Sequence, residues 1–476
     1  MEISHKKSFI ISIVAIAIVL VFIDVPLGPL PPVKNIFNPS SGVWSEPPPP
    51  YIPGASFHNI TQNGKRSEIM VYNEADGFIG IYSNTTWGLY YEQGYLEAMY
   101  RLEQMDILKR TSEGNLSAIL GPSELSTDIF FRDLNDYKIA QEEVANLSDQ
   151  NLTYIAVSEF VDGINAYINN LTPASMPVLF KILDFTPHDW TITDVFSIQQ
   201  LFLWENSAGG FDPVYFNYAL MKMPENVIRA FYPAYPAGIQ NPIVPYALNP
   251  YVYDETGDIS NLTMYSPSYN YTDNSVPVIP SIASGSNPIP SNYPGGFPLS
   301  DLQYNVYRDF GSNDWAVNGI KTSNVSSLLA NDPHLTTSVP SIWMGFQLVS
   351  PGQNVIGVVF PGFPGVVLGH NPYLAWGATN GQIQETYFYA EQINPSNRYE
   401  FFFDGSWHHF LIENETVQVK GSAPVKISVE SAPNGIVFMN TPDTIAMDWT
   451  GFYPTNELGF FLHIDRSKSI NQFVNN

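Results

Sequence analysis

The chain has 476 residues, 44% of them hydrophobic, carries a formal charge of −25 and contains no cysteine. This size and composition allow a large core in two or three lobes, and the acidic balance argues against nucleic acid as a partner because phosphate backbones bind basic surfaces. The lack of cysteine excludes thiol nucleophiles, disulfides and cysteine-ligated metal sites.

Residues 1–24 have the pattern of an export signal peptide or of a membrane anchor. Lys6 and Lys7 precede an apolar run at 9–23, which Asp24 ends. The run is short for a membrane-spanning helix but does not exclude one, and it has no clear small-residue cleavage site, so both alternatives stay open. Either way, we expect an extracellular or membrane-anchored protein that faces outside. Glycosylation sequons agree with this location. They lie at Asn59, Asn84, Asn115, Asn146, Asn151, Asn170, Asn261, Asn270, Asn324 and Asn414.

The following segments are predicted from composition and from the spacing of apolar residues. Residues 25–66 are proline-rich and predict an extended tether, whereas residues 67–236 predict a mainly helical region that begins with short strands at 69–72 and 79–82. Residues 237–311 have no usable period and predict a linker or spacer. The clearest helix has apolar side chains three and four positions apart, at Tyr95, Met99, Leu102, Met105 and Leu108. Further helices are expected at 136–147, 149–169 and 193–206.

Ser312 is the candidate nucleophile, and the peptide bond before it is the candidate processing site. A serine hydroxyl needs a neighbouring base, and cutting the Gly311–Ser312 bond would give Ser312 a free α-amine, which titrates at roughly 8 and serves as that base. Glycine at 311 leaves room for Ser312 Oγ to attack the carbonyl of residue 311. Other Gly-Ser pairs occur at 285–286, 405–406 and 421–422. Only Ser312 is followed by sequence that predicts a buried strand.

Three stretches of this sequence carry a family resemblance. Residues 92–106 read Glu-Gln-Gly-Tyr-Leu-Glu-Ala-Met-Tyr-Arg-Leu-Glu-Gln-Met-Asp, and residues 328–334 read Leu-Leu-Ala-Asn-Asp-Pro-His. Residues 355–381 contain Pro-Gly-Phe-Pro-Gly-Val-Val-Leu-Gly-His-Asn and Trp-Gly-Ala-Thr-Asn-Gly, and their alternating β-branched residues predict a meander of buried strands. Together they resemble the penicillin acylase family of N-terminal-nucleophile hydrolases.

The resemblance implies an α+β fold, the αββα sandwich of N-terminal-nucleophile hydrolases, with a helical lobe equivalent to the family's α-chain. Residues 312–476 would form the first part of the β-chain and its hydrolase core, which would be incomplete at the C-terminus. Both chains would come from one precursor, separated by the spacer.

The resemblance also implies roles for individual residues. Ser312 would be the nucleophile and its α-amine the base, Gly311 and Ser312 would flank the cut, and His334 would contact the new amine or its water. The backbone N–H of Asn380 would supply half of the oxyanion hole. The walls of the acyl pocket would include Leu203, Phe360, Phe363 and Trp376. The chemistry would need no cofactor. Glu385 retains one carboxylate of an acidic pair that binds structural calcium in the family, so a calcium ion there is a weaker expectation.

The favoured function is therefore an exported hydrolase of a small acyl amide, acting through an acyl-enzyme. The leaving amine stays open among a β-lactam nucleus, a homoserine lactone and a small peptide. In the family, an asparagine that completes the oxyanion hole lies beyond the position equivalent to Asn476. This leaves an alternative: a truncated or split member, inactive alone as an exported glycoprotein or completed by a separate C-terminal chain. A surface-layer or binding module is a third interpretation.

Overall fold

The computed structural model describes most of one compact unit. This unit comprises residues 1–210 and 291–476, and a second unit comprises residues 211–290. The described residues are 5–25, 32–38, 42, 55–62, 64–73, 77–148, 151–207, 224, 227, 312–323, 326–335, 337–381, 385–440 and 444–476. Gly311 and the predicted spacer at 237–311 lie outside them.

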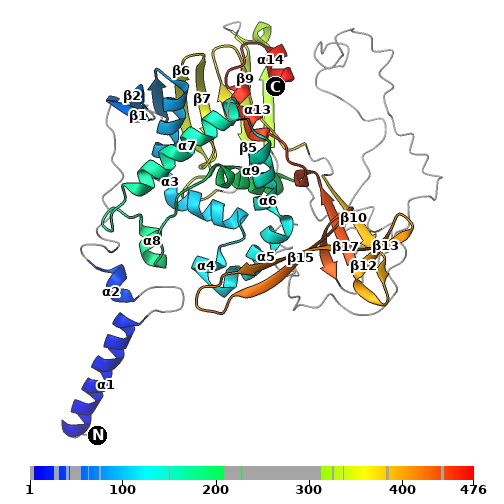
Figure 1. Cartoon of the computed structure of the whole chain (residues 1–476). Coiled ribbons are helices and arrows are strands. Elements are labelled where there is room, and N and C mark those ends of the chain that lie inside the picture. Colours follow the sequence, from blue (N-terminus) through cyan, green and yellow to red (C-terminus); the bar gives the residue numbers. More distant parts are fainter. Residues whose placement is uncertain are drawn as a thin grey trace. The chain divides into compact units, whose positions relative to one another are not determined.

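The first unit contains a seven-stranded sheet, and Figure 1 labels its strands β1, β2, β6, β7 and β9. Its strand order is β1-β2-β3-β6-β7-β8-β9, and neighbours are antiparallel except for the parallel pair β3 and β6. The strands are β1 Ala55–Gln62, β2 Lys65–Asn73, β3 Ile79–Ser83, β6 Met344–Ser350, β7 Gln353–Val359, β8 Leu368–His370 and β9 Ala375–Trp376. Strands β7 to β9 confirm the predicted meander.

Strand β1 begins within the stretch that the sequence assigns to the tether, so the ordered body starts earlier than expected. Its sequence, Ala-Ser-Phe-His-Asn-Ile-Thr-Gln, is mostly polar and has no clear apolar alternation, and most of its side chains are exposed. The strand is held by full-length antiparallel pairing with β2, from Ala55 opposite Tyr72 to Gln62 opposite Lys65. Backbone pairing of this kind leaves little signal in side-chain composition.

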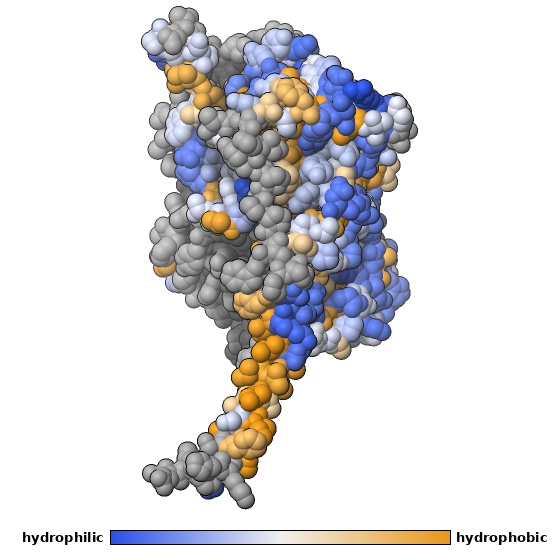
Figure 2. Space-filling model, turned by 90° about the vertical axis from the view of Figure 1, so that its left-hand side faces the viewer, coloured by the Kyte–Doolittle hydropathy of each residue, from blue (hydrophilic) through white to orange (hydrophobic). Residues whose placement is uncertain are grey.

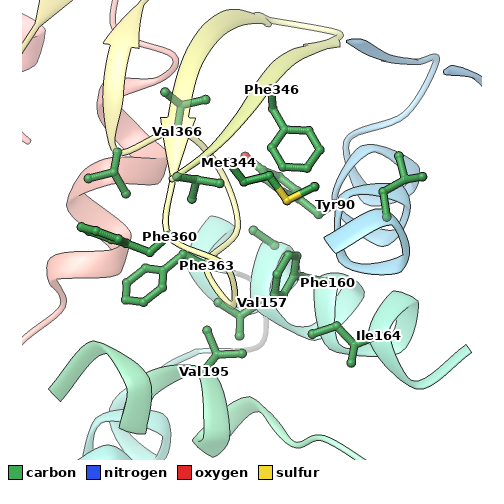
Figure 3. Close-up of a cluster of buried hydrophobic side chains, with 14 of the residues drawn as sticks. Tyr90, Val157, Phe160, Ile164, Val195, Met344, Phe346, Phe360, Phe363 and Val366 are labelled. Atoms are coloured by element: carbon green, nitrogen blue, oxygen red, sulfur yellow. The ribbon is translucent and has the colours of Figure 1, made fainter. Parts of the chain in front are cut away.

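Helices α3, α7, α9 and α13 share one hydrophobic core with this sheet (Figure 3). Their bounds are α3 Thr86–Ser112, α7 Leu152–Asn169, α9 Ile192–Asn206 and α13 Glu457–Ile464. A Cβ added at Gly94 of α3 would lie 2.0 Å from the carbonyl oxygen of Phe160, and one at Gly163 of α7 would lie 1.9 Å from that of Tyr91. Helices α3 and α7 therefore pack closely because the residues at these two contact points are glycines without a Cβ atom. The predicted helices of this region are confirmed, as is the buried stripe of α3 that includes Leu102 and Met105.

A second group of strands follows the seven-stranded sheet in the sequence. A five-stranded sheet has the order β10-β17-β16-β15-β14, and a smaller sheet has the order β11-β12-β13. The strands are β10 Thr386–Glu391, β11 Ile393–Asn394, β12 Asn397–Phe403, β13 Ser406–His409, β14 Leu411–Val417, β15 Val425–Ala432, β16 Gly435–Asn440 and β17 Thr444–Trp449. The shorter helices include α4 Ser117–Leu120, α5 Leu125–Leu134, α6 Asp136–Asn146, α8 Val178–Leu183 and α14 Ile470–Asn475. The α+β class and the helical lobe are confirmed.

Ser312 does head a strand, but the prediction that this strand is buried is wrong. Strand β4 (Ser312–Val317) pairs with β5 (Leu328–Pro333), and these two make a separate two-stranded sheet among the described strands. Trp315 is 51% exposed and Leu328 is 59% exposed. The apolar composition correctly predicted a strand, but burial needs a second layer on the strand's faces, and the described residues do not supply one.

The N-terminal segment is helical, as α1 (His5–Asp24). Exposed apolar side chains cover the face of this slender helix seen in Figure 2, and Phe9, for example, is 67% exposed. By length and hydropathy together, no helix within the described parts of the chain qualifies as a membrane span.

A buried carboxylate, Glu143 of α6, joins three helices. Its oxygens accept hydrogen bonds from Gln199 Nε2 at 3.1 and 3.3 Å, from Gln200 Nε2 at 2.8 Å and from the Thr455 backbone N–H at 3.2 Å. The Gln199 side-chain oxygen accepts the Leu458 N–H at 2.9 Å, so α6, α9 and the start of α13 meet here. Burial raises the pKa of Glu143 to about 8.

This raised pKa predicts a protein that is more stable in mild acid than in mild base. Because folded Glu143 holds its proton up to about pH 8, whereas its ordinary pKa is 4.5, its stabilising contribution is present at low pH and is lost as pH rises across that interval. We expect the melting temperature to fall between pH 5 and pH 8 by roughly 5 °C more in the unmodified protein than in Glu143→Gln. Thermal melts of both proteins check this, and equal pH slopes would contradict it.

Candidate functional site

The β4–β5 hairpin presents Ser312 on one of its two faces. Ser312 lies opposite Pro333, and Asp314 lies opposite Asn331. Because side chains alternate along a strand and directly opposed residues share a face, the side chains of Ser312, Asp314 and Asn331 lie on the same side of the hairpin. Ser312 itself is half-buried.

Asn331 joins this face to the segment 377–381, which contains Asn380. Its Nδ2 donates to the carbonyl oxygens of Asn313, at 3.2 Å, and of Ala378, at 2.9 Å. Its Oδ1 accepts the Ala378 N–H at 3.3 Å. A Cβ added at Gly377 would lie 2.7 Å from the Asn331 Cβ, so the close approach depends on glycine there. The Ser312 hairpin and the segment that is predicted to supply the oxyanion donor are thus held side by side by the amide side chain of Asn331.

His334 lies beside the Ser312 backbone but on the other face of the hairpin. Its Nε2 is 2.9 Å from Asp332 Oδ2 and 3.3 Å from Asn313 Nδ2. Asn313 and Asp332 are directly opposed and point away from the side on which the Ser312 hydroxyl lies. This position is compatible with a contact to the Ser312 amine, which belongs to the backbone, and it places the ring away from the hydroxyl.

Asn380 contacts the end of helix α9. Its Nδ2 donates to the Asn206 carbonyl oxygen at 2.6 Å. One turn earlier on α9, the Phe202 ring stacks on Phe360 with centroids 4.2 Å apart and meets the edge of Phe363 at 5.5 Å. The helix therefore connects the predicted oxyanion segment with two predicted pocket residues.

The predicted pocket residues lie close to this helix and mainly within the core. Phe360, Phe363 and Trp376 are 9%, 4% and 6% exposed, and Trp376 Nε1 donates to the Val367 carbonyl oxygen at 3.0 Å. Figure 3 shows Phe360 and Phe363 next to each other above α9 residue Val195. Leu203 of α9 is half-buried. Their role as walls of an acyl pocket stays a prediction.

Comparison with known proteins assigns the family. A profile described as penicillin amidase matches residues 68–476, more than half of the chain. The chain belongs to the penicillin amidase family. The members of this family are amide hydrolases whose chemistry uses no cofactor, and its N-terminal-nucleophile hydrolase fold agrees with the α+β structure described above.

Relatives in this family are similar over most of the chain. An acyl-homoserine lactone acylase, QuiP, of Pseudomonas aeruginosa is 26% identical over 373 residues, covering 78% of this chain and 40% of the relative. Penicillin G acylase of Escherichia coli is 23% identical over 401 residues, covering 79% and 46%. The chain thus spans less than half the length of these relatives. A solved thermostable penicillin G acylase from Alcaligenes faecalis aligns with a TM-score of 0.32 and 23% identity, covering 34% of this chain and 30% of that chain.

The structure also bears on the calcium site that was expected at Glu385 of this penicillin amidase family member. Among the described residues, no group of three or more histidine, aspartate or glutamate side chains gathers to hold a metal ion, so the structure gives no support to calcium at Glu385.

A cavity of about 480 Å³ lies between the end of α3, helices α5 and α6, and β14. Its lining residues include none from the Ser312 hairpin or from segment 377–381, so it is separate from the predicted site.

Sequence reasoning missed Asn331. The residue stands inside the quoted motif at 328–334, but its role depends on which backbone lies opposite its amide, and that is a tertiary contact. The available signal was its position: an asparagine that directly follows the apolar residues Leu328 to Ala330 of a strand, near a candidate nucleophile, is a reason to ask which groups its amide would bind.

Proposed function

We propose that the chain is an amide hydrolase of the penicillin amidase type that cuts its own Gly311–Ser312 bond and then uses Ser312 as an N-terminal nucleophile. The Ser312 α-amine takes the hydroxyl proton while Oγ attacks the carbonyl carbon of a small acyl amide. The backbone N–H of Asn380 stabilises the oxyanion, the amine leaves with a proton, and an acyl ester remains on Ser312. Water then hydrolyses the ester and releases the carboxylic acid.

One observation carries this proposal: Asn331 bonds the backbone next to Ser312 and the backbone two residues before Asn380. This contact supports the proposal because it joins the segment that contains Ser312 to the segment that contains Asn380. The family match over residues 68–476 supports amide hydrolysis as the reaction type. Self-processing is supported by a relative from a Pseudomonas species, named penicillin acylase 2 proenzyme, which is 22% identical over 385 residues.

The test is to purify the unmodified protein, measure its intact mass and N-termini, and assay hydrolysis of a series of N-acyl amides. We expect a new N-terminus at Ser312 and release of free acid and amine. Protein that stays a single chain with Gly311 joined to Ser312 would overturn the N-terminal-nucleophile mechanism.

In a second candidate function, the protein is a hydrolase only when additional polypeptide covers the β4–β5 hairpin. That polypeptide would belong either to the same chain or to a separate one. Exposed apolar side chains on β4 and β5 favour it, because Trp315, Val317, Leu328 and Leu329 are 51%, 38%, 59% and 38% exposed. Self-cleavage at Ser312 without amide hydrolysis would support this candidate, whereas turnover by the 476-residue chain alone would contradict it.

Export is part of the same proposal. It is supported by Lys6 and Lys7 ahead of the apolar run at 9–23. Cell fractionation combined with N-terminal sequencing tests the location and tells a cleaved signal from a retained anchor, and recovery of uncleaved chain in the cytosol alone would contradict export.

A further inference from the structure

The cavity of about 480 Å³ at the end of α3 has no part in the proposed function. Its volume lies in the range of sites that bind small organic molecules, roughly 300–1,000 Å³, and is far larger than a metal ion needs. The last residues of α3 form one wall, and α5, α6 and β14 form the others. In Figure 1, α5 lies beside β15, the strand that pairs with β14. Segments far apart in the sequence thus build this cavity.

The positive side chains in the cavity wall are already neutralised. Arg132 of α5 donates to Glu415 Oε2 at 2.7 Å, and the Lys138 ammonium of α6 donates to Glu413. Lys138 and Glu413 are 41% and 36% exposed, whereas Arg132 is 18% exposed, which indicates an entrance near Lys138. A bound anion would have to displace a carboxylate from one of these ion pairs, so the wall disfavours anions.

Glu113, in the opposite wall, has no comparable partner. Its ion-pair partner is Lys109, whose Nζ is 4.0 Å away and lies closer to Asp194, at 2.9 Å. Within the described part of the chain, no hydrogen-bond donor reaches the Glu113 carboxylate oxygens. Burial raises the pKa of Glu113 to about 7, because the charged form has lost water without gaining a donor. A ligand that brings a donor to these oxygens would relieve this cost.

The end of α3 adds to the negative potential around Glu113. Ser112, Glu113 and Asn115, which all line the cavity, lie at or just after the C-terminus of this 27-residue helix. The helix dipole places partial negative charge at this end, so a carboxylate here is disfavoured and a cation is stabilised. Arg110, in the last turn, is bound to Asp106 at 2.7 Å and is engaged there. The unbalanced negative potential therefore faces the cavity.

We propose that this cavity is a binding site for a small organic cation with a primary ammonium group, which the Glu113 carboxylate holds at the end of α3. Asn115 and Tyr137, which also line the cavity, offer further oxygen acceptors to the ammonium group. The uncharged part of the ligand would extend toward the two ion pairs at β14. The site goes beyond the proposed function and does not depend on Ser312 chemistry.

The first test compares tyramine with tyrosol, in which a hydroxyl replaces the ammonium group and the rest is unchanged. For the unmodified protein at pH 8, calorimetric titration should give tyramine a Kd of about 1 mM or tighter, as expected for a ligand of roughly ten non-hydrogen atoms. Tyrosol should bind about tenfold more weakly, because hydrogen bonds between charged groups are the stronger ones. Equal affinity for the two compounds, or no tyramine binding at about 10 mM, would overturn the proposal.

Substitution of the carboxylate locates the ammonium group. Glu113→Gln preserves the shape and removes the charge, so the Kd for tyramine should rise about tenfold while that for tyrosol stays the same. The matched control is Glu142→Gln, which removes an exposed carboxylate of α6 outside the cavity lining and should change neither Kd. Thermal melts verify that both variants fold. Tyramine binding that is equal in Glu113→Gln and Glu142→Gln would reject Glu113 as the ammonium ligand.

The pH dependence of binding is a further readout and needs no variant. Tyramine keeps its charge because alkylammonium groups titrate near 10, whereas Glu113 gains its charge as pH rises through about 7. Tyramine should therefore bind roughly tenfold more tightly at pH 8 than at pH 6, and Glu113→Gln should bind it equally at both. A slope that persists in this variant would belong to another group and would contradict the proposal. The other groups around Glu113 or across the cavity are Asp106, Lys109, Arg110, Tyr137, Asp194, Arg132, Lys138, Glu413 and Glu415.

A last arm separates this site from the hydrolase site, where an amine product would also bind. Ser312→Ala protein should bind tyramine as tightly as the unmodified protein does, because the cavity lining includes no residue of the Ser312 hairpin or of segment 377–381. This result would stand even if the unmodified protein hydrolysed no amide. Loss of tyramine binding in Ser312→Ala would assign the amine to the Ser312 site and would overturn the proposal.

Discussion

Ser312→Ala protein is expected to remain a single uncut chain with no amide hydrolase activity. The substitution removes the oxygen that attacks the carbonyl of residue 311 and the same oxygen that later attacks the substrate, so both reactions lose their nucleophile. Removal of a catalytic nucleophile typically costs on the order of 10⁶-fold in turnover, which is complete loss in an ordinary assay. Intact-mass analysis and N-terminal sequencing measure the cut, and anilide hydrolysis measures turnover.

Two variants make this result specific. Ser312→Cys retains a nucleophilic atom at the γ position and should still cut the bond between residues 311 and 312. Its cleavage rate relative to the unmodified protein should follow the fraction of the thiol that is ionised. Ser406→Ala changes another serine that follows glycine, at the start of β13, and should leave both processing and turnover unchanged. Cleavage before residue 312 in the alanine variant would show that Ser312 is not the processing nucleophile.

Asn331→Asp is expected to reduce turnover and processing about 100-fold while the protein still folds. The change preserves shape but replaces the two N–H bonds to the Asn313 and Ala378 carbonyl oxygens with a carboxylate that faces them. The hairpin and segment 377–381 would separate, and a misplacement of about 1 Å near reacting atoms costs on the order of 10²-fold. Asn331→Ala, which removes the donors without adding repulsion, should lose less.

The matched control for Asn331 is Asn318→Ala. Asn318 follows β4 in the same hairpin, and its Oδ1 accepts the Ile320 N–H at 3.0 Å, so its loss affects only the turn. We expect normal processing and turnover in this control. Circular dichroism and thermal melting confirm folding of all variants, and equal activity of Asn331→Asp and Asn318→Ala would disprove the bridging role of Asn331.

Much of the fold could be predicted from local pattern. The stripe with Leu102 and Met105 predicted α3 because helical spacing places residues three and four apart on one face. Strands β7 to β9 followed from β-branched residues interrupted by Pro-Gly and His-Asn turns, and Ser312 was correctly placed at the head of a strand. Strand β1 was missed because its polar side chains carry no alternation, and its stability comes from backbone pairing with β2.

For the candidate site too, some features could be predicted from the sequence and others required the folded structure. The family and the candidate roles of Ser312, His334 and Asn380 could be predicted from the chain alone, because these predictions rest on residue identity and on order along the chain. Three contacts became visible only in the folded chain: Asn331 bonds the Asn313 backbone and segment 377–381, His334 lies on the hairpin face away from the Ser312 hydroxyl, and Glu97 and Gln93 hold the backbone of the Phe360 loop. Each of these contacts pairs a side chain with backbone or side-chain atoms of another segment, and single-chain periodicity carries no information about which segment that is. The exposure of β4 has the same origin: composition predicts that a strand prefers to be covered, but only the neighbouring layers decide whether it is.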